Sequence, residues 1–374
     1  MAVEIREISG KKGIRNFVTF PFKLYQGNPY WVPPLIFDEV SSLDPQKNPA
    51  FEFCEAKLWM AFKNGEPVGR IAGIINHKAN ERWNTKSARF GWLDFTNDEE
   101  VSRALLNTVE DWARIQGMHA VHGPLGFTDM DKEGMLIEGF NELGTIATYY
   151  NHPYYPVHME KAGYTKDADW VEYEFRNTGY IPEKFRRIGQ LTLERYQLRI
   201  AKFKSKKELL KYAPQIFEVL NEAYKNLYGF VPLTPQQIDY YIKMYFSFVK
   251  VDFISVILDK DERVAAFGIT MPSMSKAVQR AKGKLFPLGF IHMLRAMYVN
   301  DTVDFYLTAV RPDLQGKGVN ALLFLDLIPK YTAFGIQKAE SNVELENNQM
   351  VQRQWELFEK RQHKRRRAYV KHLN

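Results

Sequence analysis

Hydrophobic and polar residues alternate along the chain in a pattern that predicts short strands, helices and tight turns. Residues 59–75, WMAFKNGEPVGRIAGII, predict a β-hairpin because two apolar runs flank an Asn-Gly turn. Residues 254–270, ISVILDKDERVAAFGIT, have the same form with DKDE at the turn. After each hairpin the pattern predicts a strand, a helix and a second strand, at 87–95, 99–117 and 118–125 in the first half and at 303–310, 319–335 and 336–344 in the second.

The two halves of the chain share this order and much of its spacing. Placing Val68 on Val264 sets an offset of 196 residues, and Asn151 falls on Asn347 at the same offset. Between these points each half has its own insertion, residues 126–150 in the first and 271–297 in the second. The matching offsets favour a duplication, although strand–helix–strand order is common to all α/β chains.

We therefore predict two mixed α/β units, one over residues 1–180 and one over residues 190–374. The seam is predicted at 176–190, RNTGYIPEKFRRIGQ, which is polar and contains Gly and Pro. A new strand is expected directly afterwards, in YQLRIAKF.

Composition narrows the class of protein. The chain has 374 residues, of which 45% are hydrophobic and 14% aromatic, and this excludes a disordered or fibrous protein. The formal net charge of +7 is compatible with an anionic ligand. Cys54 is the only cysteine, which excludes an internal disulfide and fits a reducing compartment. No run of 18 apolar residues occurs, so we expect a cytoplasmic protein without membrane contact.

The turn in VRPDLQGKGVNALLF, residues 310–324, lies between a predicted strand and a predicted helix. Backbone N–H groups at a helix N-terminus suit a pyrophosphate, and glycines let the ligand approach closely. The loop resembles the Q/R-x-x-G-x-G/A signature of the GCN5-related N-acetyltransferases (GNATs), with Gln315, Gly316, Lys317, Gly318, Val319 and Asn320 in that window.

This resemblance implies a fold of two tandem acyl-CoA N-acyltransferase-like units, each a mixed, mostly antiparallel sheet flanked by helices. It implies acetyl-CoA or another acyl-CoA as co-substrate and no metal. The second half is expected to hold the coenzyme, while Asp98, Glu99 and Glu100 replace the loop glycines in the first half and make it a degenerate partner domain. The implied coenzyme-binding residues are Ala309, Val310, Gln315, Gly316, Lys317, Gly318, Val319, Asn320 and Asn348.

Two residues depart from the family pattern. Trp355 lies seven residues after Asn348, where the family often has a tyrosine that protonates the coenzyme thiolate. Asn320 occupies a position where the family prefers Gly or Ala. Both departures are compatible with a divergent enzyme or with a non-catalytic relative.

Candidate catalytic residues come from two predicted strands. Strict alternation would place Asp304, Tyr306 and Thr308 on one face of 303–310. It would also place Glu340, Asn342 and Glu344 on one face of the following strand. In the GNAT fold these two strands splay apart around the acyl group, so we predict Tyr306 and Glu344 as general base and substrate contact, although polar rows of this kind also face solvent.

Two further segments have alternative interpretations. Residues 28–40, NPYWVPPLIFDEV, are predicted as an extended segment that packs on the first unit. The basic C-terminus, EKRQHKRRRAYVKHLN, could bind nucleic acid, but it also fits the last strand of the second unit, and nucleic acid is the less favoured partner.

The predicted function is acyl-CoA-dependent N-acyl transfer, with acetyl as the expected group and an amine of a small molecule as acceptor. The alternatives are a Fem-like aminoacyl transferase that uses charged tRNA, and a non-catalytic, acyltransferase-like ligand-binding protein. The sequence leaves the acceptor, the acyl chain length and the oligomeric state open.

Overall fold

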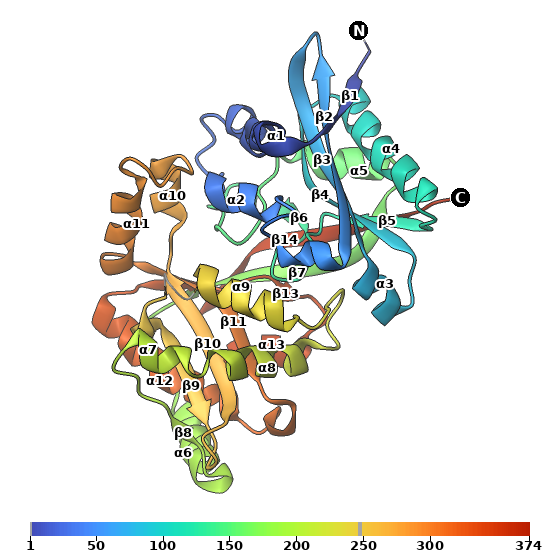
Figure 1. The fold of residues 1–374 in the computed structure, drawn as a ribbon. Coiled ribbons are helices and arrows are strands. Elements are labelled where there is room, and N and C mark those ends of the chain that lie inside the picture. Colours follow the sequence, from blue (N-terminus) through green and yellow to red (C-terminus); the bar gives the residue numbers. More distant parts are fainter. Residues whose placement is uncertain (1, 246–248) are drawn as a thin grey trace. The chain divides into compact units, whose positions relative to one another are not determined.

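A computed structural model describes residues 2–245 and 249–374, and the chain divides into two compact units (Figure 1). The first unit consists of residues 1–171, 275–293 and 363–374, and the second consists of residues 172–274 and 294–362. Each unit is thus assembled from segments that lie far apart in the sequence, rather than from one half of the chain.

The first unit is a mixed, mostly antiparallel sheet in the order β1-β2-β3-β4-β5-β14, with β6 paired to β14. All neighbouring strands are antiparallel except β4 and β5. The strands are β1 (Glu4–Ile8), β2 (Cys54–Lys63), β3 (Glu66–Asn76), β4 (Ser87–Phe95), β5 (Ala120–Gly123), β6 (Met135–Glu138) and β14 (Lys360–His372). Its helices are α1 (Gly10–Leu24), α2 (Ile36–Ser42), α3 (His77–Trp83), α4 (Glu99–Ile115), α5 (Tyr154–Lys161) and α10 (Ser275–Ala281).

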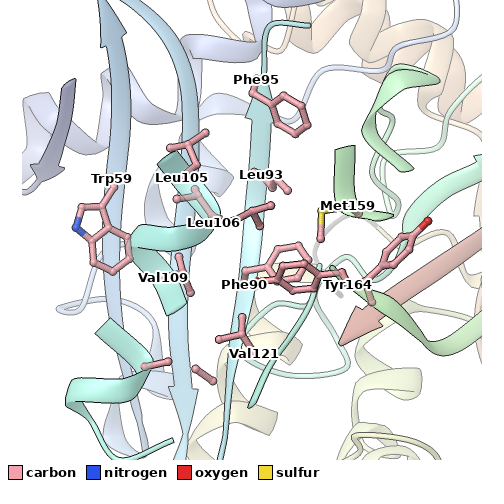
Figure 2. Close-up of a cluster of buried hydrophobic side chains, with 14 of the residues drawn as sticks. Trp59, Phe90, Leu93, Phe95, Leu105, Leu106, Val109, Val121, Met159 and Tyr164 are labelled. Atoms are coloured by element: carbon pink, nitrogen blue, oxygen red, sulfur yellow. The ribbon is translucent and has the colours of Figure 1, made fainter. Parts of the chain in front are cut away.

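The hairpin of β2 and β3 shows how the alternating pattern forms the core of this unit. Asn64 and Gly65 both have positive φ, 55° and 78°, as a type I′ turn requires. Alternate strand residues then face opposite sides of the sheet. Trp59 and Ile71 join the core under α4. Figure 2 shows this core with Trp59 labelled. Met60 and Ala72 point to the other side of the sheet and join the core under α1 and α2.

The second unit has the corresponding sheet in the order β7-β12-β11-β10-β9-β8, with β13 paired to β7. Its neighbours are antiparallel except β11 and β12. The strands are β7 (Thr165–Arg176), β8 (Arg199–Ile200), β9 (Ile254–Leu258), β10 (Val264–Pro272), β11 (Thr302–Val310), β12 (Lys338–Glu340) and β13 (Glu344–Leu345). The helices are α6 (Glu183–Tyr196), α7 (Lys206–Leu210), α8 (Ala213–Tyr224), α9 (Pro235–Tyr245), α12 (Val319–Phe334) and α13 (Gln349–Gln354), while α11 (Gly289–Tyr298) begins in residues of the first unit.

Both predicted hairpins and the first strand–helix–strand segment are confirmed, as are the strand and the helix that open the second segment. The prediction for 28–40 is wrong in part, because α2 begins at Ile36. Within the predicted seam, the chain is irregular only up to Pro182, and α6 then begins at Glu183. The strand predicted over 336–344 is interrupted: β12 ends at Glu340, and β13 starts at Glu344.

The last strand of each sheet comes from the other half of the sequence. Residues 369–372 of β14 pair with β5 of the first unit. Residues 174–176 of β7 pair with β12 of the second unit. The basic C-terminus forms a strand, as predicted, but its assignment as the last strand of the second unit is wrong, because it pairs with β5 and β6 of the first unit. A local residue pattern carries no information on which sheet a strand joins.

None of the helices in residues 2–245 and 249–374 combines the length and the apolar character needed to cross a membrane.

Candidate functional site

The predicted glycine loop connects β11 to α12. A 3₁₀ turn, Pro312–Leu314, follows β11, and α12 begins at Val319 with Gly318 as its N-cap residue. Gly316 and Gly318 have positive φ, 72° and 81°, the left-handed region that glycine adopts without strain. The predicted strand–loop–helix geometry is therefore confirmed.

The N-terminus of α12 offers free hydrogen-bond donors. Gly318, the N-cap residue, has no side chain that could cap the helix. Within the described residues, the N–H groups of Val319 and Asn320 also donate to no backbone carbonyl. The first turn of a helix carries unpaired N–H groups and the positive end of the helix dipole, so a pyrophosphate fits these residues.

Other loop residues hold the backbone in place. Gln315 Nε2 donates to the carbonyl oxygen of Val310 at 3.0 Å, which closes the loop on the end of β11. Arg311 pairs with Asp259 at 2.8 Å and with Asp313 at 2.7 Å. The Arg311 guanidinium lowers the pKa of Asp313, so this carboxylate is held by a cation beside the loop.

The two loop glycines have different surroundings. A Cβ atom on Gly316 would meet nothing within 4 Å, whereas one on Gly318 would lie 2.5 Å from Ile188 Cγ2. Ile188 belongs to α6, and Thr192 of the same helix donates to the carbonyl oxygen of Lys317 at 3.2 Å. Gly318 is thus required by packing against α6, while Gly316 leaves its side of the loop open.

Strands β11 and β12 separate as the GNAT resemblance implies. Their parallel pairing runs from Thr302 with Lys338 to Asp304 with Glu340 and stops there. A register shift on the other side of β11 pairs Phe305 with Thr270 and Leu307 with Ile269, so Tyr306 is the extra residue of a β-bulge. The predicted strict alternation over 303–310 is therefore wrong, because the bulge re-aims the side chains after Phe305.

Tyr306, predicted as catalytic, has a buried hydroxyl group. Within the described residues this hydroxyl has no hydrogen-bond partner. Burial, and then the charges of Asp304 and Glu340, raise the pKa of Tyr306 well above 10. The phenol therefore stays protonated and can donate a hydrogen bond to a ligand. Asn342 Nδ2 donates to the backbone oxygen of Tyr306 at 3.3 Å. The residues that follow β12 therefore lie beside the bulge.

Glu344, the second predicted catalytic residue, is paired with the tryptophan at the family's tyrosine position. Trp355 Nε1 donates to Oε1 of Glu344 at 2.8 Å and to Oε2 at 3.1 Å. Burial raises the pKa of Glu344 to about 8. The hydrogen bond from Trp355 lowers this pKa, but by less than burial raises it. A carboxyl with a pKa near the working pH is a competent general base.

A cavity of about 260 Å³ in the second unit is lined in part by Trp355. It is mostly aromatic, with contributions from β7, β11, α12 and the turn at Trp355. Its walls suit an apolar group rather than an ion. The lining residues are Phe175, Arg176, Asn177, Thr178, Tyr180, Phe305, Phe324, Ile328, Tyr331, Ala339, Trp355, Phe358 and Glu359.

The remaining predicted coenzyme residues occupy structural positions close to the loop. Asn348 caps α13, and its side chain accepts a hydrogen bond from Val351 N at 3.4 Å. Asn320 Nδ2 donates to Gln354 Oε1 at 3.2 Å, which ties the first turn of α12 to α13. Ala309 is buried within β11, where it pairs with Phe267.

The first unit has the same topology with different chemistry at the corresponding helix. Asp98 is the N-cap residue of α4 and accepts a hydrogen bond from Glu100 N at 3.0 Å. Lys63 forms ion pairs with both Asp98 and Glu100. The distance from its Nζ atom to Glu100 Oε2 is 2.8 Å. The Asp98 carboxylate occupies one of the N–H groups at this helix N-terminus, and its negative charge repels a phosphate.

The basic C-terminus forms β14, where acidic partners hold much of its charge. Arg365 and Arg367 both pair with Asp169, at 3.0 and 2.8 Å. Lys371 pairs with Glu110 at 2.9 Å. These contacts account for arginines and lysines that the sequence presented as a continuous basic run.

Two features of the first unit lay outside the predicted site. Cys54 is buried, and burial raises the pKa of its thiol to about 12, which suits a structural residue. Carboxyl groups of residues 129–133 lie near Arg89, and Asp131 also interacts with the carboxyl groups of α2. Burial raises the pKa of Asp38 to about 6 and that of Asp129 to about 7. The spacing TDMDKE in the insertion 126–150 was the available sequence signal for this cluster.

Comparisons with solved structures place this architecture among known folds. A tandem GNAT protein from the clavulanic acid biosynthesis pathway matches 100% of this chain and 99% of its own length, with a TM-score of 0.56 and 12% sequence identity. The chain thus has the GNAT fold in its two-unit form, with mixed, mostly antiparallel sheets flanked by helices. No protein-family model matches the sequence.

Two curated protein sequences resemble the chain over most of its length. Protein YghO of Escherichia coli is 26% identical over 379 aligned positions, which cover 99% of this chain and 95% of that protein. The bacterial ceramide synthase of Caulobacter vibrioides is 27% identical over 296 positions, covering 75% of this chain and 73% of that protein.

Proposed function

We propose that this protein is an acyl-CoA-dependent N-acyltransferase whose coenzyme site lies in the second unit. The observation that carries this proposal is the uncapped N-terminus of α12, preceded by two left-handed glycines at the end of a strand that separates from its parallel neighbour. On the GNAT fold this combination supports a pyrophosphate at the loop and a thioester near the strand gap.

The reaction needs a group that takes a proton from the attacking amine. A bound acyl-CoA would supply the thioester carbonyl that the amine attacks. Glu344, with its pKa raised to about 8, would accept the ammonium proton. The free hydroxyl of Tyr306 would donate a hydrogen bond to an oxygen of the substrate. Trp355 positions Glu344 rather than acting as the acid that the family's tyrosine provides.

For the acceptor, we propose an amine that carries a long apolar chain. Ceramide is an N-acylated long-chain amino alcohol, and a relative named as a bacterial ceramide synthase matches three quarters of this chain. The aromatic cavity beside Trp355 supports an apolar group on one of the two substrates. The earlier expectation of acetyl transfer to a small molecule is the competing form of this proposal.

A pair of variants at Gly316 tests the coenzyme site. Asn and Asp both tolerate the left-handed backbone, and a Cβ at this position meets nothing within 4 Å, so both variants should fold. Only Asp adds a negative charge beside the proposed pyrophosphate. We expect Gly316→Asp to bind CoA at least about tenfold more weakly than Gly316→Asn, as measured by calorimetry.

Equal CoA affinities of the two variants, with wild-type binding established, would contradict the assignment of the loop. Acceptor choice is read from CoA thiol release by the wild type with sphinganine and with ethanolamine, which shares the amino alcohol but lacks the chain. Preference for ethanolamine would reject the long-chain acceptor while leaving the coenzyme site intact.

The second candidate is a non-catalytic ligand-binding protein. It is favoured by Trp355, which occupies the position where the family often has a tyrosine that acts as general acid. This candidate requires CoA binding without thiol release for any of these amines.

A further inference from the structure

The segment from α10 to the end of α11 exposes a continuous run of large apolar side chains. Before α11, Phe286 is 77% exposed and Leu288 is 62% exposed. Within α11, Phe290, Leu294 and Tyr298 recur at a spacing of four residues and are 45%, 57% and 66% exposed. Side chains four apart lie on one face of a helix, so these residues form one apolar stripe.

The same segment is strongly basic. Between Arg263 and Asp301 the sequence contains no Asp or Glu. Five basic side chains in it are exposed, and none of them forms an ion pair within the described residues, in contrast to the basic residues of β14. They are Lys276, Arg280, Lys282, Lys284 and Arg295.

This exposure is not the consequence of a loose insertion. Gln279 of α10 donates to the carbonyl oxygens of Pro29 and Trp31, at 2.9 and 2.8 Å. Ile36 N donates to the carbonyl oxygen of Gly283 at 3.0 Å, and Ala277 and Val278 are buried. Hydrogen bonds and burial on one side hold α10 and Gly283 within the first unit, whereas most of the large apolar side chains from Phe286 to Val299 are exposed. Figure 1 shows α10 and α11 as two consecutive short helices.

We propose that this segment, residues 276–299, docks the protein on an anionic lipid surface. Aromatic and aliphatic side chains beside exposed Lys and Arg are the combination by which an interfacial helix enters the headgroup region. A second copy of the chain is disfavoured as the partner, because two such faces would bring like charges together. The absence of a run of 18 apolar residues predicted no membrane contact, but a helix that lies on a membrane surface needs no run of that length.

Co-sedimentation of the full chain with lipid vesicles tests the proposal. The wild type is expected to bind vesicles of phosphatidylcholine mixed with phosphatidylglycerol, to bind phosphatidylcholine alone more weakly, and to lose affinity as salt rises. Lys284→Gln/Arg295→Gln should weaken partitioning to the mixed vesicles by roughly 30-fold, since each basic residue near such a surface contributes about one factor of five. The matched control is Lys11→Gln/Lys12→Gln, which removes two exposed lysines elsewhere.

The apolar contribution has its own variant. Ile291→Ser/Leu294→Ser removes two exposed apolar side chains of α11 and should abolish binding to both kinds of vesicle. Ile115→Ser, at an 81% exposed apolar residue of α4, should bind as the wild type does. Unchanged CoA binding in all four variants would show that the fold and the proposed coenzyme site are intact.

Absence of wild-type binding to either vesicle would overturn the proposal, as would binding that neither segment variant reduces. Capture of an acidic protein through these residues without vesicle binding would also overturn it, and would assign the surface to a protein partner.

Discussion

The contact between Glu344 and Trp355 is the residue-scale feature that distinguishes this site from the family pattern. The position that holds a tyrosine in many GNATs holds an indole, whose N–H is bonded to both carboxylate oxygens of Glu344. Burial nevertheless dominates and raises the pKa of Glu344 to about 8. Under the proposed function, this arrangement replaces the family's acid with a base, Glu344, that Trp355 holds in a fixed position.

This arrangement predicts the pH dependence of catalysis. A general base must be deprotonated, so kcat/KM should rise with pH and level off above about 8. Glu344→Gln should lower kcat/KM by about 10²–10⁴-fold and remove that rise. Trp355→Phe takes away the hydrogen bond that lowers the pKa of Glu344, so it should shift the rise to higher pH. A Gln variant with the wild-type rate and profile would exclude Glu344 as the base.

At the scale of elements, the contact between α6 and the start of α12 fixes the glycine loop that is proposed to bind the coenzyme. Ile188 and Thr192 of α6 approach Gly318 from one side, and Thr192 binds the carbonyl of Lys317. The other side of the loop, at Gly316, is open. The helix that occupies most of the predicted seam is thus a structural support for the proposed phosphate site.

Alanine at the two glycines measures this support. Both positions have positive φ, so each substitution should cost about 1–2 kcal/mol of backbone strain. Gly318→Ala also places a Cβ atom against Ile188, so it should lower the free energy of unfolding by roughly a further 1–3 kcal/mol. Urea unfolding of both variants measures the difference. Equal losses of unfolding free energy for Gly316→Ala and Gly318→Ala would show that Ile188 of α6 can move away from residue 318 without loss of stability.

At the scale of the whole molecule, each sheet is completed by a strand from the other half of the chain. The end of β14 joins β5 in the first unit, and the end of β7 joins β12 in the second. Neither half of the sequence therefore contains all the strands of one sheet. A fragment cut near residues 180–190 would lack the strand that covers β5 or the one that covers β12.

Buried carboxyl groups also link the stability of the molecule to pH. Burial, with the nearby charge of Glu39 adding to it, raises the pKa of Asp38 from 3.8 to about 6. The folded state therefore binds this proton more tightly than the unfolded state. The stabilisation is complete below about pH 4 and is lost as pH rises through about 6.

The variant Asp38→Asn isolates this effect because an amide does not titrate. Between pH 4 and pH 7, the wild type should lose roughly 3 kcal/mol of unfolding free energy relative to the variant. Denaturant unfolding of both proteins across that range measures the difference. A constant difference would mean that Asp38 titrates in the folded protein as it does in the unfolded chain.

The sequence by itself determined the local elements, because their signals lie within a few residues of one another. The Asn-Gly turn, the capped start of α4 and the glycine loop before α12 all form where the residue pattern placed them. The resemblance of the glycine loop to the GNAT signature named the candidate coenzyme residues and, together with strand alternation, selected Tyr306 and Glu344 as candidates.

Only the tertiary structure decided which strand completes which sheet, where β11 bulges, and what surrounds each candidate side chain. Partners such as Glu344 with Trp355, or Gly318 with Ile188, meet through packing that no periodicity encodes. The sequence also could not predict which apolar residues are exposed. Residues 286–299 have the apolar composition of a core, yet many of their large side chains lie at the surface. Burial depends on what the rest of the chain covers, and that is settled only when the whole chain has folded.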